Sequence, residues 1–517
     1  METNITFFKK NILILLIVLL STVLSIIFLQ QKINYHIDEL LTYSLANSTS
    51  YIDVEPGEKY NAYGEFQESF LSTPEETNFD YANVWRNQAN DVHPPFYYVI
   101  VHTISSVFSG EFSPYIGIAV NLIFNAFIIV LLYKFAMLIT GNKFAAFLTS
   151  VFWAVNPGVI SDMMFIRMYI MTMFFCLWIA YIHLKNIKLG NTVDYKFYIS
   201  VYLVSLAGAL THYYFLILTF FICAIFVFYL LFRKQWRKLF IYIGAYVSML
   251  VSVIVLFPSI YDHILGGGQR GEESIENFMS TNGYLSTLHS FWGKISDNLF
   301  GGYLLFFVIA IVIIMIASNM RLRNQNMASG NSFWMVVYLL VVCSLYFFLI
   351  SNIAVYTVER YLQPIFPLIV LIFICLLHGA MRTLLNQNNS LVVCCILLLL
   401  ISVNGYWKTT SFEYLQKDSA EALQIAEQYQ GNDVIYLYDR TWKIPTHYME
   451  LANYKSVTFY KMNDLAMLYE KENYDEFVVY SQSEDTTIME ELVEHLPAVE
   501  SYTKLNNYGY CTVYYLE

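Results

Sequence analysis

The chain has 517 residues, of which 57% are hydrophobic and only 13% are charged. A soluble globular protein carries about 25% charged residues, so this composition argues against a soluble enzyme and predicts a polytopic α-helical membrane protein that resides in a lipid bilayer. The formal net charge of −11 argues against nucleic acid as a partner, because phosphate binding requires a basic surface that the chain lacks.

Residues 11–29 form the first apolar run and follow Lys9 and Lys10. This run approaches the length of about 20 residues that a bilayer requires, and it has no small-residue cleavage site, so we expect an uncleaved anchor. Because lysines precede it, the amino terminus is expected in the cytoplasm and residue 30 outside. Residues 30–110 follow as a large external loop, in which 94–108 are expected to form a short juxtamembrane helix.

The later apolar runs bring the expected number of spans to about eleven, because this count places every basic cluster on the cytoplasmic side. The later spans are expected at 114–137, 144–157, 163–184, 197–210, 213–232, 238–257, 302–320, 332–351, 361–380 and 388–406. With these spans, residues 258–300 form a second large external loop. We take 1–411 as the transmembrane domain.

Residues 412–517 have a different character and are expected outside the membrane. The β-branched and aromatic runs lie at 433–439, 456–461, 476–482 and 509–517. Acidic, helix-like segments separate them at 418–430 and 485–496. Alternating strands and helices predict a small extracytoplasmic α/β domain. No glycine-rich fingerprint follows its first strand, so no nucleotide-binding role is expected.

With this topology, five polar clusters from distant parts of the chain meet at the outer face of the membrane. They are HIDE (36–39), DVHPPFYY (91–98), SDMMFIRMY (161–169), THYYF (211–215) and VERYLQP (358–364). Each has an ordinary explanation when it is considered alone: solvated loop acids, a turn, an arginine that snorkels to the interface, or an aromatic belt. Their occurrence on one face instead indicates an active site that opens outward.

The chemistry that fits these residues is transfer of a sugar from a lipid phosphate to a hydroxyl group. A carboxylate can take the proton of the attacking hydroxyl. Arginines can neutralise the phosphate leaving group, because their planar guanidinium binds phosphate oxygens in pairs and stays charged. A lipid-linked donor would also explain a site at the membrane surface, since its tail stays in the bilayer.

The five clusters, in this order over residues 10–380, resemble the C-type membrane glycosyltransferases (GT-C). The match is to the bacterial branch similar to family 39, the protein O-mannosyltransferases, and to the lipid A aminoarabinose transferases. The resemblance implies the GT-C fold, a polyprenyl-phosphate sugar donor and inversion at the anomeric carbon. The α/β tail departs from the mannosyltransferases, which favours a cell-wall, teichoic acid or glycolipid acceptor over a protein.

Roles follow from the resemblance residue by residue. Asp38 matches the catalytic base, and Glu39 is expected to contact substrate or to hold Asp38. The residues expected to bind the donor phosphate or sugar are Arg167, Tyr169, His212, Tyr213, Arg360 and Tyr361. Those expected to line the cavity or contact the acceptor are His93, Tyr97 and Asp162.

No cofactor is required by any local pattern, although some members of the wider superfamily use a divalent metal. Asp38, Asp162 and His212 could supply ligands, but no ligand spacing demands one. Two other functions stay open: a transporter or lipid flippase, and a non-catalytic scaffold of the cell envelope. A transporter more often carries paired half-repeats and charges near the middle of its spans.

Overall fold

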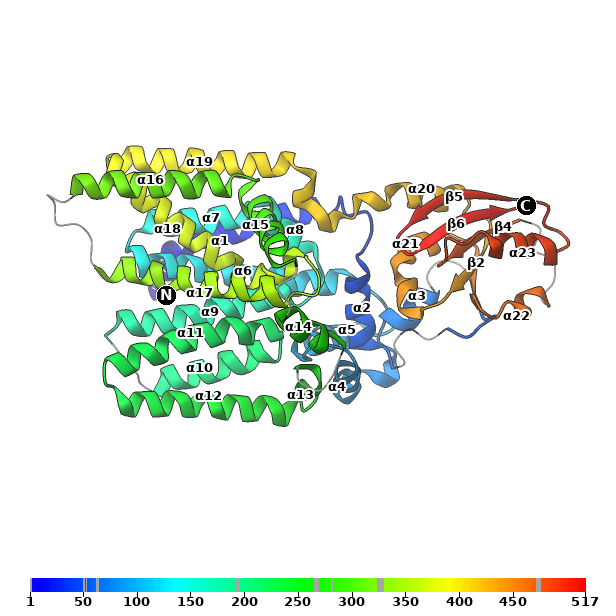
Figure 1. Ribbon diagram of the computed structural model, residues 1–517, viewed down its shortest axis with the longest axis horizontal. Helices are drawn as coiled ribbons and strands as arrows, with labels where there is room; N and C mark the ends of the chain where they lie inside the picture. The colour runs from blue at the N-terminus through cyan, green and yellow to red at the C-terminus, as the bar shows by residue number, and fades with distance from the viewer. Residues whose placement is uncertain are drawn as a thin grey trace.

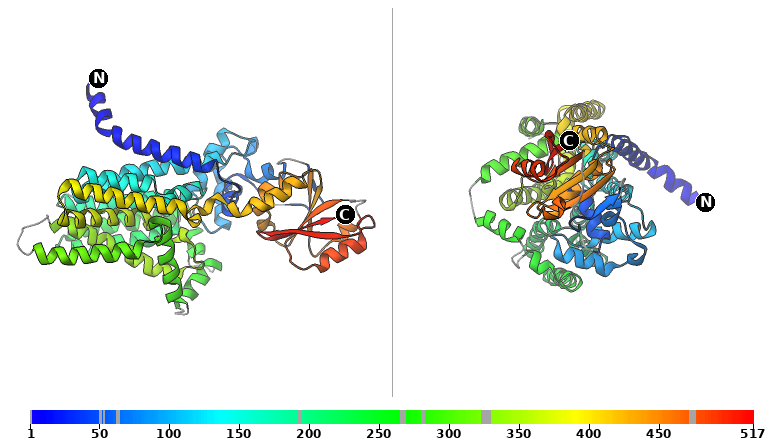
Figure 2. Two further views of the ribbon diagram at one scale, coloured as in Figure 1. Left: turned by 90° about the horizontal axis from the view of Figure 1, so that it is seen from above. Right: turned by 90° about the vertical axis from the view of Figure 1, so that its right-hand side faces the viewer.

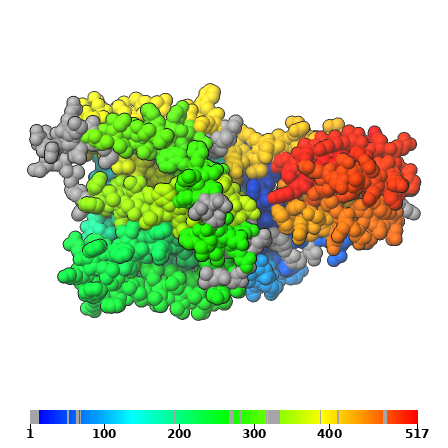
Figure 3. Space-filling view, in the orientation of Figure 1, coloured from blue at the N-terminus to red at the C-terminus, as the bar shows by residue number. Residues whose placement is uncertain are grey.

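The computed structural model describes residues 2–49, 52, 54–61, 65–190, 195–264, 269–279, 283–322, 330–470 and 476–517. Within these residues the chain forms a long helical bundle with a small α/β domain at one end (Figure 1). The space-filling view shows the same division, with the carboxyl-terminal residues in orange and red beyond the bundle (Figure 3). The expected architecture, a membrane-embedded helical part with a small sheet-containing domain, is confirmed.

The long helices of the bundle run along one axis (Figures 1 and 2). They are α1 (Glu2–Leu29), α6 (Tyr115–Thr140), α7 (Lys143–Ala154), α9 (Tyr169–Lys188), α10 (Tyr195–Ala209), α11 (Tyr213–Phe232), α12 (Trp236–Leu256), α16 (Leu304–Leu322), α17 (Gly330–Ile353), α18 (Phe366–Leu384) and α19 (Gln387–Trp407), and the short α8 (Pro157–Met164) follows α7 at an angle. Eight helices among the described residues are long and apolar enough to cross a membrane, or ten if each of two bent pairs is one span. The count of eleven stays a prediction, because it includes α10, whose 15 residues are fewer than a span requires.

Burial separates the central helices from those at the lipid-facing rim. The windows tested as spans are 83% buried in α18 and 72% buried in α9, but only 22% buried in α12 and 17% in α1. The outward faces of α12 and α16 carry large apolar side chains such as Phe240, Val255 and Phe306. In water such surfaces would be unfavourable, so their natural solvent is the bilayer.

The expected span at 144–157 is interrupted, because α7 ends at Ala154 and α8 begins at Pro157. The two helices meet at 52° and together qualify as one span. Asn156 caps α8, because its side-chain oxygen accepts hydrogen bonds from the amides of Gly158 (3.0 Å) and Val159 (3.3 Å), and Pro157 occupies the first turn. Proline is well suited to that position, where no amide hydrogen is needed. This bend directs the chain toward the segment 165–168, which carries Arg167.

Shorter helices cover the end of the bundle at which α1 ends, near Leu29 (Figure 1). In the first loop they are α2 (Ile37–Asn47), α3 (Glu65–Leu71), α4 (Tyr81–Asn90) and α5 (Phe96–Val107), and in the loop before α16 they are α13 (Ile260–Ile264), α14 (Gln269–Met279) and α15 (Tyr284–Phe300). The 12-residue α5 is too short to span and packs beside α2 and α4. Its length fits the juxtamembrane helix expected over 94–108.

The sheet of the α/β domain has six strands in the order β1-β3-β2-β4-β6-β5. They are β1 (Lys59–Asn61), β2 (Asp433–Tyr438), β3 (Ser456–Lys461), β4 (Phe477–Ser481), β5 (Tyr502–Tyr508) and β6 (Cys511–Leu516). The centre is parallel and the edge pairs are antiparallel. The helices are α20 (Ala420–Gln428), α21 (Tyr448–Leu451), α22 (Ala466–Tyr469) and α23 (Thr487–His495), with the 3₁₀ segment η6 (Thr441–His447) after β2.

One strand of this sheet comes from the first external loop. β1 pairs with β3 in antiparallel register, with Lys59 opposite Thr458 and Asn61 opposite Ser456. The Lys59 ammonium also lies 3.2 Å from the Asp433 carboxylate on β2. The first loop is therefore tied to the carboxyl-terminal domain, and the two cannot move independently without breaking a sheet edge.

Gly117 of α6 gives a direct test of the packing behind the segment 165–168. A Cβ atom at this position would lie 2.1 Å from Ile166 Cγ2, next to Arg167. We therefore expect Gly117→Ala to destabilise the protein by about 1–3 kcal/mol, as overpacking does, and to lower its melting temperature in detergent. Gly244→Ala on α12 is the control, because a Cβ there meets no atom within 4 Å. Equal melting temperatures for the two variants would contradict this packing.

Candidate active site

Helix α2 begins with a reciprocal cap that separates the roles of its two acids. The amide of Asp38 donates to His36 Nδ1 (3.1 Å), while Glu39 Oε2 accepts from the His36 amide (2.7 Å). Such a capping box satisfies amides that the first helical turn leaves unpaired. It fixes Glu39 against the start of its own helix, so the two adjacent carboxylates are held in different surroundings.

Glu39 is fully buried and forms an anchor rather than part of the cavity wall. Both of its carboxylate oxygens lie 2.8 Å from the Lys32 ammonium, and Oε1 also accepts from the Ile166 amide (3.0 Å). Lys32 donates in addition to the Met164 carbonyl (3.1 Å). Burial lowers the pKa of the Lys32 ammonium, and Glu39 opposes that change. The pair therefore joins the end of α1, the start of α2 and the segment 164–166.

Asp38 faces the opposite way and forms an ion pair with Arg360. Its Oδ2 lies 3.1 Å from the Arg360 guanidinium, and 21% of its side chain is exposed. Burial raises the pKa of the Asp38 carboxyl, but the charges of Arg167 and Arg360 outweigh burial and hold the pKa below its ordinary value. Asp38 is thus an ionised carboxylate at neutral pH, paired with Arg360 and stabilised by the more distant charge of Arg167.

Arg167 is buried, with 5% exposure, and neutral groups hold it. One terminal nitrogen donates to the Tyr98 hydroxyl (2.9 Å) and the Thr42 hydroxyl (3.2 Å). Among the described residues no carboxylate lies within ion-pair distance of it, and its Nε has no hydrogen-bond partner. A buried guanidinium without a paired anion is costly, so this position is prepared for a negatively charged ligand.

Two histidines complete the polar end of the site. His93 Nδ1 lies 2.8 Å from Asp91 Oδ2, and the His93 and His212 rings are 5.9 Å apart. His212 caps α11, because its Nδ1 accepts the Tyr214 amide (3.0 Å). Burial lowers the pKa of the His212 imidazole, and His93 and Arg167 lower it further. His212 is consequently neutral at pH 7 and is available as a hydrogen-bonding group.

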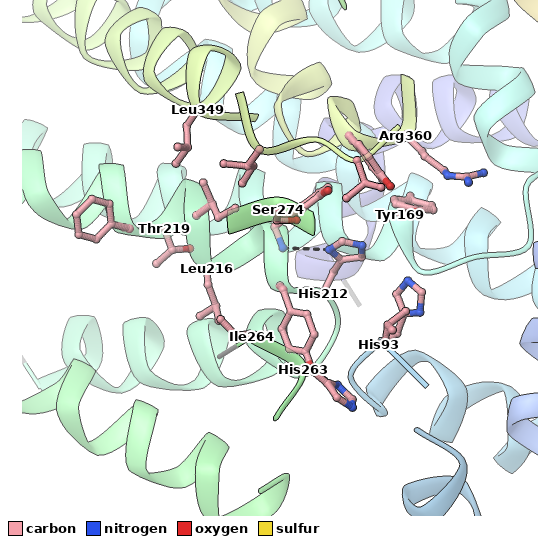
Figure 4. A pocket seen from close by; sticks show the side chains of 18 of the residues that line it. His93, Tyr169, His212, Leu216, Thr219, His263, Ile264, Ser274, Leu349 and Arg360 are labelled. Atoms are coloured by element: carbon pink, nitrogen blue, oxygen red, sulfur yellow. Dashed lines mark hydrogen bonds between the residues drawn. The ribbon is translucent and has the colours of Figure 1, made fainter. Parts of the chain in front are cut away.

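These side chains line one cavity of about 860 Å³ with two chemically different ends. His93, Tyr169 and Arg360 gather at one end, whereas Leu216, Thr219 and Leu349 lie at the other (Figure 4). The apolar end is built from helices α11, α12, α14 and α17 through Ile217, Phe220, Leu250, Ile275, Phe278 and Ile353. A cavity with a charged end and a long apolar end suits an amphipathic ligand.

Eight of the eleven residues expected at the site line this cavity. They are Asp38, His93, Arg167, Tyr169, His212, Tyr213, Arg360 and Tyr361. Glu39, Tyr97 and Asp162 are not among the lining residues. Tyr97 is buried, and its hydroxyl donates to Asn121 (3.3 Å). Asp162 is buried on α8, with 2% exposure. Glu39, Tyr97 and Asp162 are therefore buried residues outside the cavity wall.

Four further polar residues matter that the sequence patterns did not single out. Lys32, Thr42, Tyr98 and Asp91 fix Glu39, Arg167 and His93 through the contacts described above. Tyr98 belongs to the HPPFYY motif, but neighbouring positions of a helix point about 100° apart, and the motif alone does not tell which tyrosine meets the arginine. His263 was also missed: its Nδ1 lies 2.7 Å from the hydroxyl of the lining residue Tyr213.

The residues considered as metal ligands do not come together. Among the described residues, no group of three or more His, Cys, Asp or Glu side chains is placed to hold a metal ion. Asp38 and His212 line the cavity, but Asp162 does not. Asp38 instead has Arg360 as its close partner, at 3.1 Å.

No protein-family model matches the chain, and no curated protein matches it significantly. Among solved structures, ArnT from Cupriavidus metallidurans bound to undecaprenyl phosphate is similar, with a TM-score of 0.53 and 12% identity over 98% of both chains. ArnT in the apo state gives 0.46 and 12%, covering 92% of this chain and 96% of that one. The arabinofuranosyltransferase AftD from Mycobacteria gives 0.40 and 10%, covering 92% of this chain and 39% of that one.

The match to lipid-bound ArnT extends over almost the whole of both chains, including the carboxyl-terminal domain. At 12% identity such a likeness establishes architecture and not activity. The chain is therefore a multi-pass membrane protein with the C-type glycosyltransferase fold.

Proposed function

We propose that this protein is a membrane glycosyltransferase that transfers a sugar from a polyprenyl-phosphate donor to a hydroxyl group of a cell-envelope acceptor. The observation that carries the proposal is the cavity that combines the Asp38 carboxylate and two arginines, Arg167 and Arg360, with an apolar end. The fold supports it, because the similar ArnT structure contains undecaprenyl phosphate. The acceptor would be a polysaccharide, a teichoic acid, a glycolipid or a protein.

In this proposal the donor binds along the length of the cavity. Its phosphate takes the place between Arg167 and Arg360, where bidentate guanidinium contacts are strong because the surroundings are buried. Tyr169, His212 and Tyr361 contact the phosphate or the sugar. The polyprenyl chain follows the apolar side chains of α11 and α17 toward the bilayer.

Asp38 is the proposed base. The acceptor hydroxyl oxygen attacks the anomeric carbon of the donor, the bond from that carbon to the phosphate oxygen breaks, and Asp38 takes the hydroxyl proton. The leaving group is polyprenyl phosphate, and Arg167 and Arg360 stabilise the negative charge that develops on it. Attack from the face opposite the phosphate would invert the anomeric carbon.

The free protein holds Asp38 in a weakly basic state, because Arg167 and Arg360 lower the pKa of its carboxyl. A donor phosphate between the same arginines would neutralise part of their charge and raise that pKa. Asp38 would then become more basic only when a donor is bound. Glu39 has a positioning role in this scheme, since it fixes the turn of α2 that presents Asp38.

The first prediction concerns the base itself. We expect Asp38→Asn to reduce transfer from a polyprenyl-phosphate sugar by about 10²–10⁴-fold, because general-base catalysis contributes that much. The purified variant is assayed beside Asp464→Asn, which changes an exposed acid of the carboxyl-terminal domain. Both variants should keep normal expression and membrane insertion. Full activity of Asp38→Asn would contradict the assignment of Asp38 as base.

The second prediction concerns pH. Because Arg167 and Arg360 lower the pKa of Asp38 in the free protein, the kcat/KM of the wild type should persist as the pH falls below the ordinary range for an aspartate, until Asp38 is protonated. Arg360→Gln removes this charge, so the pKa of Asp38 rises and the acid limb of the profile of kcat/KM moves to higher pH. Arg360→Lys is the control: it keeps the charge and the acid limb, and it weakens only donor binding. An unchanged limb in Arg360→Gln would exclude this coupling.

The third prediction concerns orientation. We propose that the amino terminus is cytoplasmic and that the carboxyl-terminal domain is outside, because Lys9 and Lys10 precede the first span and cytoplasmic flanks are rich in lysine and arginine. Alkaline phosphatase fused after Glu517 should be active. Green fluorescent protein fused at the same place should not fluoresce, because the general secretory route exports it unfolded. The reverse result would place the site on the cytoplasmic side.

A further inference from the structure

Two aromatic side chains stand together on the surface of the carboxyl-terminal domain. Within the described part of residues 412–517, three large hydrophobic side chains are exposed: Trp442 (39%), Met467 (42%) and Tyr510 (41%). The Trp442 and Tyr510 rings meet edge to face, with centroids 5.3 Å apart. The Lys443 ammonium lies 5.8 Å from the centre of the Tyr510 ring. We refer to Trp442 and Tyr510 as the aromatic pair.

The backbone holds this pair in a fixed place. Trp442 lies on η6, and Tyr510 lies in the tight turn between β5 and β6. Gly509 in that turn has a φ of +60°, and a Cβ there would lie 2.6 Å from Thr446 Cγ2 of η6. Glycine is therefore needed both for the left-handed backbone and for the close approach of the turn to η6. The turn that carries Tyr510 is thus packed directly against η6, which carries Trp442.

The same part of the domain contacts the segment that carries Asp38. η6 packs against α2, the Tyr448 ring meets the Tyr35 ring edge to face at 6.1 Å, and Asn34 donates to Glu450 (3.4 Å). In Figure 1, α21, which directly follows η6, lies on the side of the domain that faces the helix bundle. The aromatic pair is thus attached beside the polar end of the cavity.

The electrostatics place Tyr510 near the site as well. Burial raises the pKa of the Tyr510 hydroxyl, the charge of Asp38 raises it further, and Arg360 opposes this rise. Tyr356 also acts on it; this residue is 51% exposed and follows Val355, which lines the cavity. Tyr510 and Tyr356, from the two parts of the protein, therefore share the electrostatic surroundings of Asp38 and Arg360.

We propose that Trp442 and Tyr510 form a saccharide-binding platform that holds the acceptor glycan beside Asp38. This inference rests on the proposed glycosyltransferase function and names the part of the site that recognises the acceptor. Aromatic rings suit a sugar, because they cover the apolar C–H face of a pyranose while the indole N–H and phenol O–H bond to its hydroxyls. The Lys443 ammonium is already paired with Asp439 at 3.0 Å, so its charge is balanced. The platform therefore favours a neutral sugar over an anionic one.

The test measures saccharide binding directly, with the purified full-length chain in detergent micelles. Soluble chitohexaose serves as the probe for a polysaccharide chain, and diglucosyl diacylglycerol in the micelle as the probe for a glycolipid headgroup. Isothermal titration compares the wild type with the double variant Trp442→Ala, Tyr510→Ala. The ring-retaining double variant Trp442→Phe, Tyr510→Phe controls for folding, and Met467→Ala controls for loss of an exposed apolar side chain elsewhere in the domain.

We expect the wild type to bind one or both probes, and the alanine double variant to bind at least about tenfold more weakly, as truncation of central Trp and Tyr contacts does. The phenylalanine double variant keeps the rings but loses the indole N–H and the phenol O–H, so it should bind more weakly than the wild type and more tightly than the alanine double variant. Met467→Ala should bind like the wild type. Binding of one probe alone identifies the source of the saccharide and supports the platform. The proposal is overturned if the wild type binds neither probe, if the alanine double variant binds normally, or if Met467→Ala weakens binding equally.

The binding measurement separates the platform from the catalytic proposal. Asp38→Asn should keep most of the probe affinity, because the aromatic pair supplies the main contacts in this proposal and Asp38 contacts only the attacking hydroxyl. If Asp38→Asn transfers sugar normally, the proposed function fails while the saccharide measurement still stands. If transfer depends on Asp38 but no probe binds, only the platform fails.

Discussion

The buried carboxylate of Glu39 is the contact on which the arrangement of the site depends. It accepts hydrogen bonds from the Lys32 ammonium, the His36 amide and the Ile166 amide. Those three donors belong to the end of α1, the cap of α2 and the segment before α9. Breaking a buried ion pair leaves an uncompensated charge, which is strongly destabilising. Glu39 thereby fixes the turn that presents Asp38 and the segment that presents Arg167.

The excess positive charge of the two arginines links the polar end of the cavity to its apolar end. Arg167 and Arg360 bring two positive charges to one end of the cavity, and among the described residues only Arg360 has a carboxylate within ion-pair distance, that of Asp38. In a partly buried site this imbalance is costly, and a phosphate would relieve it. The apolar end beside α11 and α17 would accept the lipid to which such a phosphate is attached. A lipid-linked phosphate, the proposed donor, would satisfy both features together.

The sequence predicted the architecture well, because its strongest signals are local. Long apolar runs mark helices, basic residues mark one side of the membrane, and β-branched runs such as 433–439 and 456–461 coincide with β2 and β3. The gathering of Asp38, His93 and Arg360 was also predictable, because topology alone places their segments at one end.

Other features depend on tertiary contacts that no local pattern encodes. β1 is only three residues long and exists because β3 offers it an edge. Asp38 and Glu39 are neighbours with the same chemistry, and only the capping box and the buried Lys32 separate an anchor from a cavity-lining acid. Likewise, the sequence did not show which of the neighbouring tyrosines, Tyr97 or Tyr98, contacts Arg167; in the structure it is Tyr98, whose hydroxyl accepts from the guanidinium. The number of spans stays open because α10 and the bent pairs lie near the limit of length.

The central claim, that the arginines around Asp38 receive a lipid-linked phosphate, is tested most directly by an electron cryomicroscopy structure of the protein with undecaprenyl phosphate. The account predicts phosphate density within hydrogen-bond distance of both Arg167 and Arg360, with the lipid along α11 and α17. It also predicts a longer distance between Asp38 and Arg360 than the present 3.1 Å. Density for the phosphate outside this cavity, with the Asp38–Arg360 pair unchanged, would contradict it.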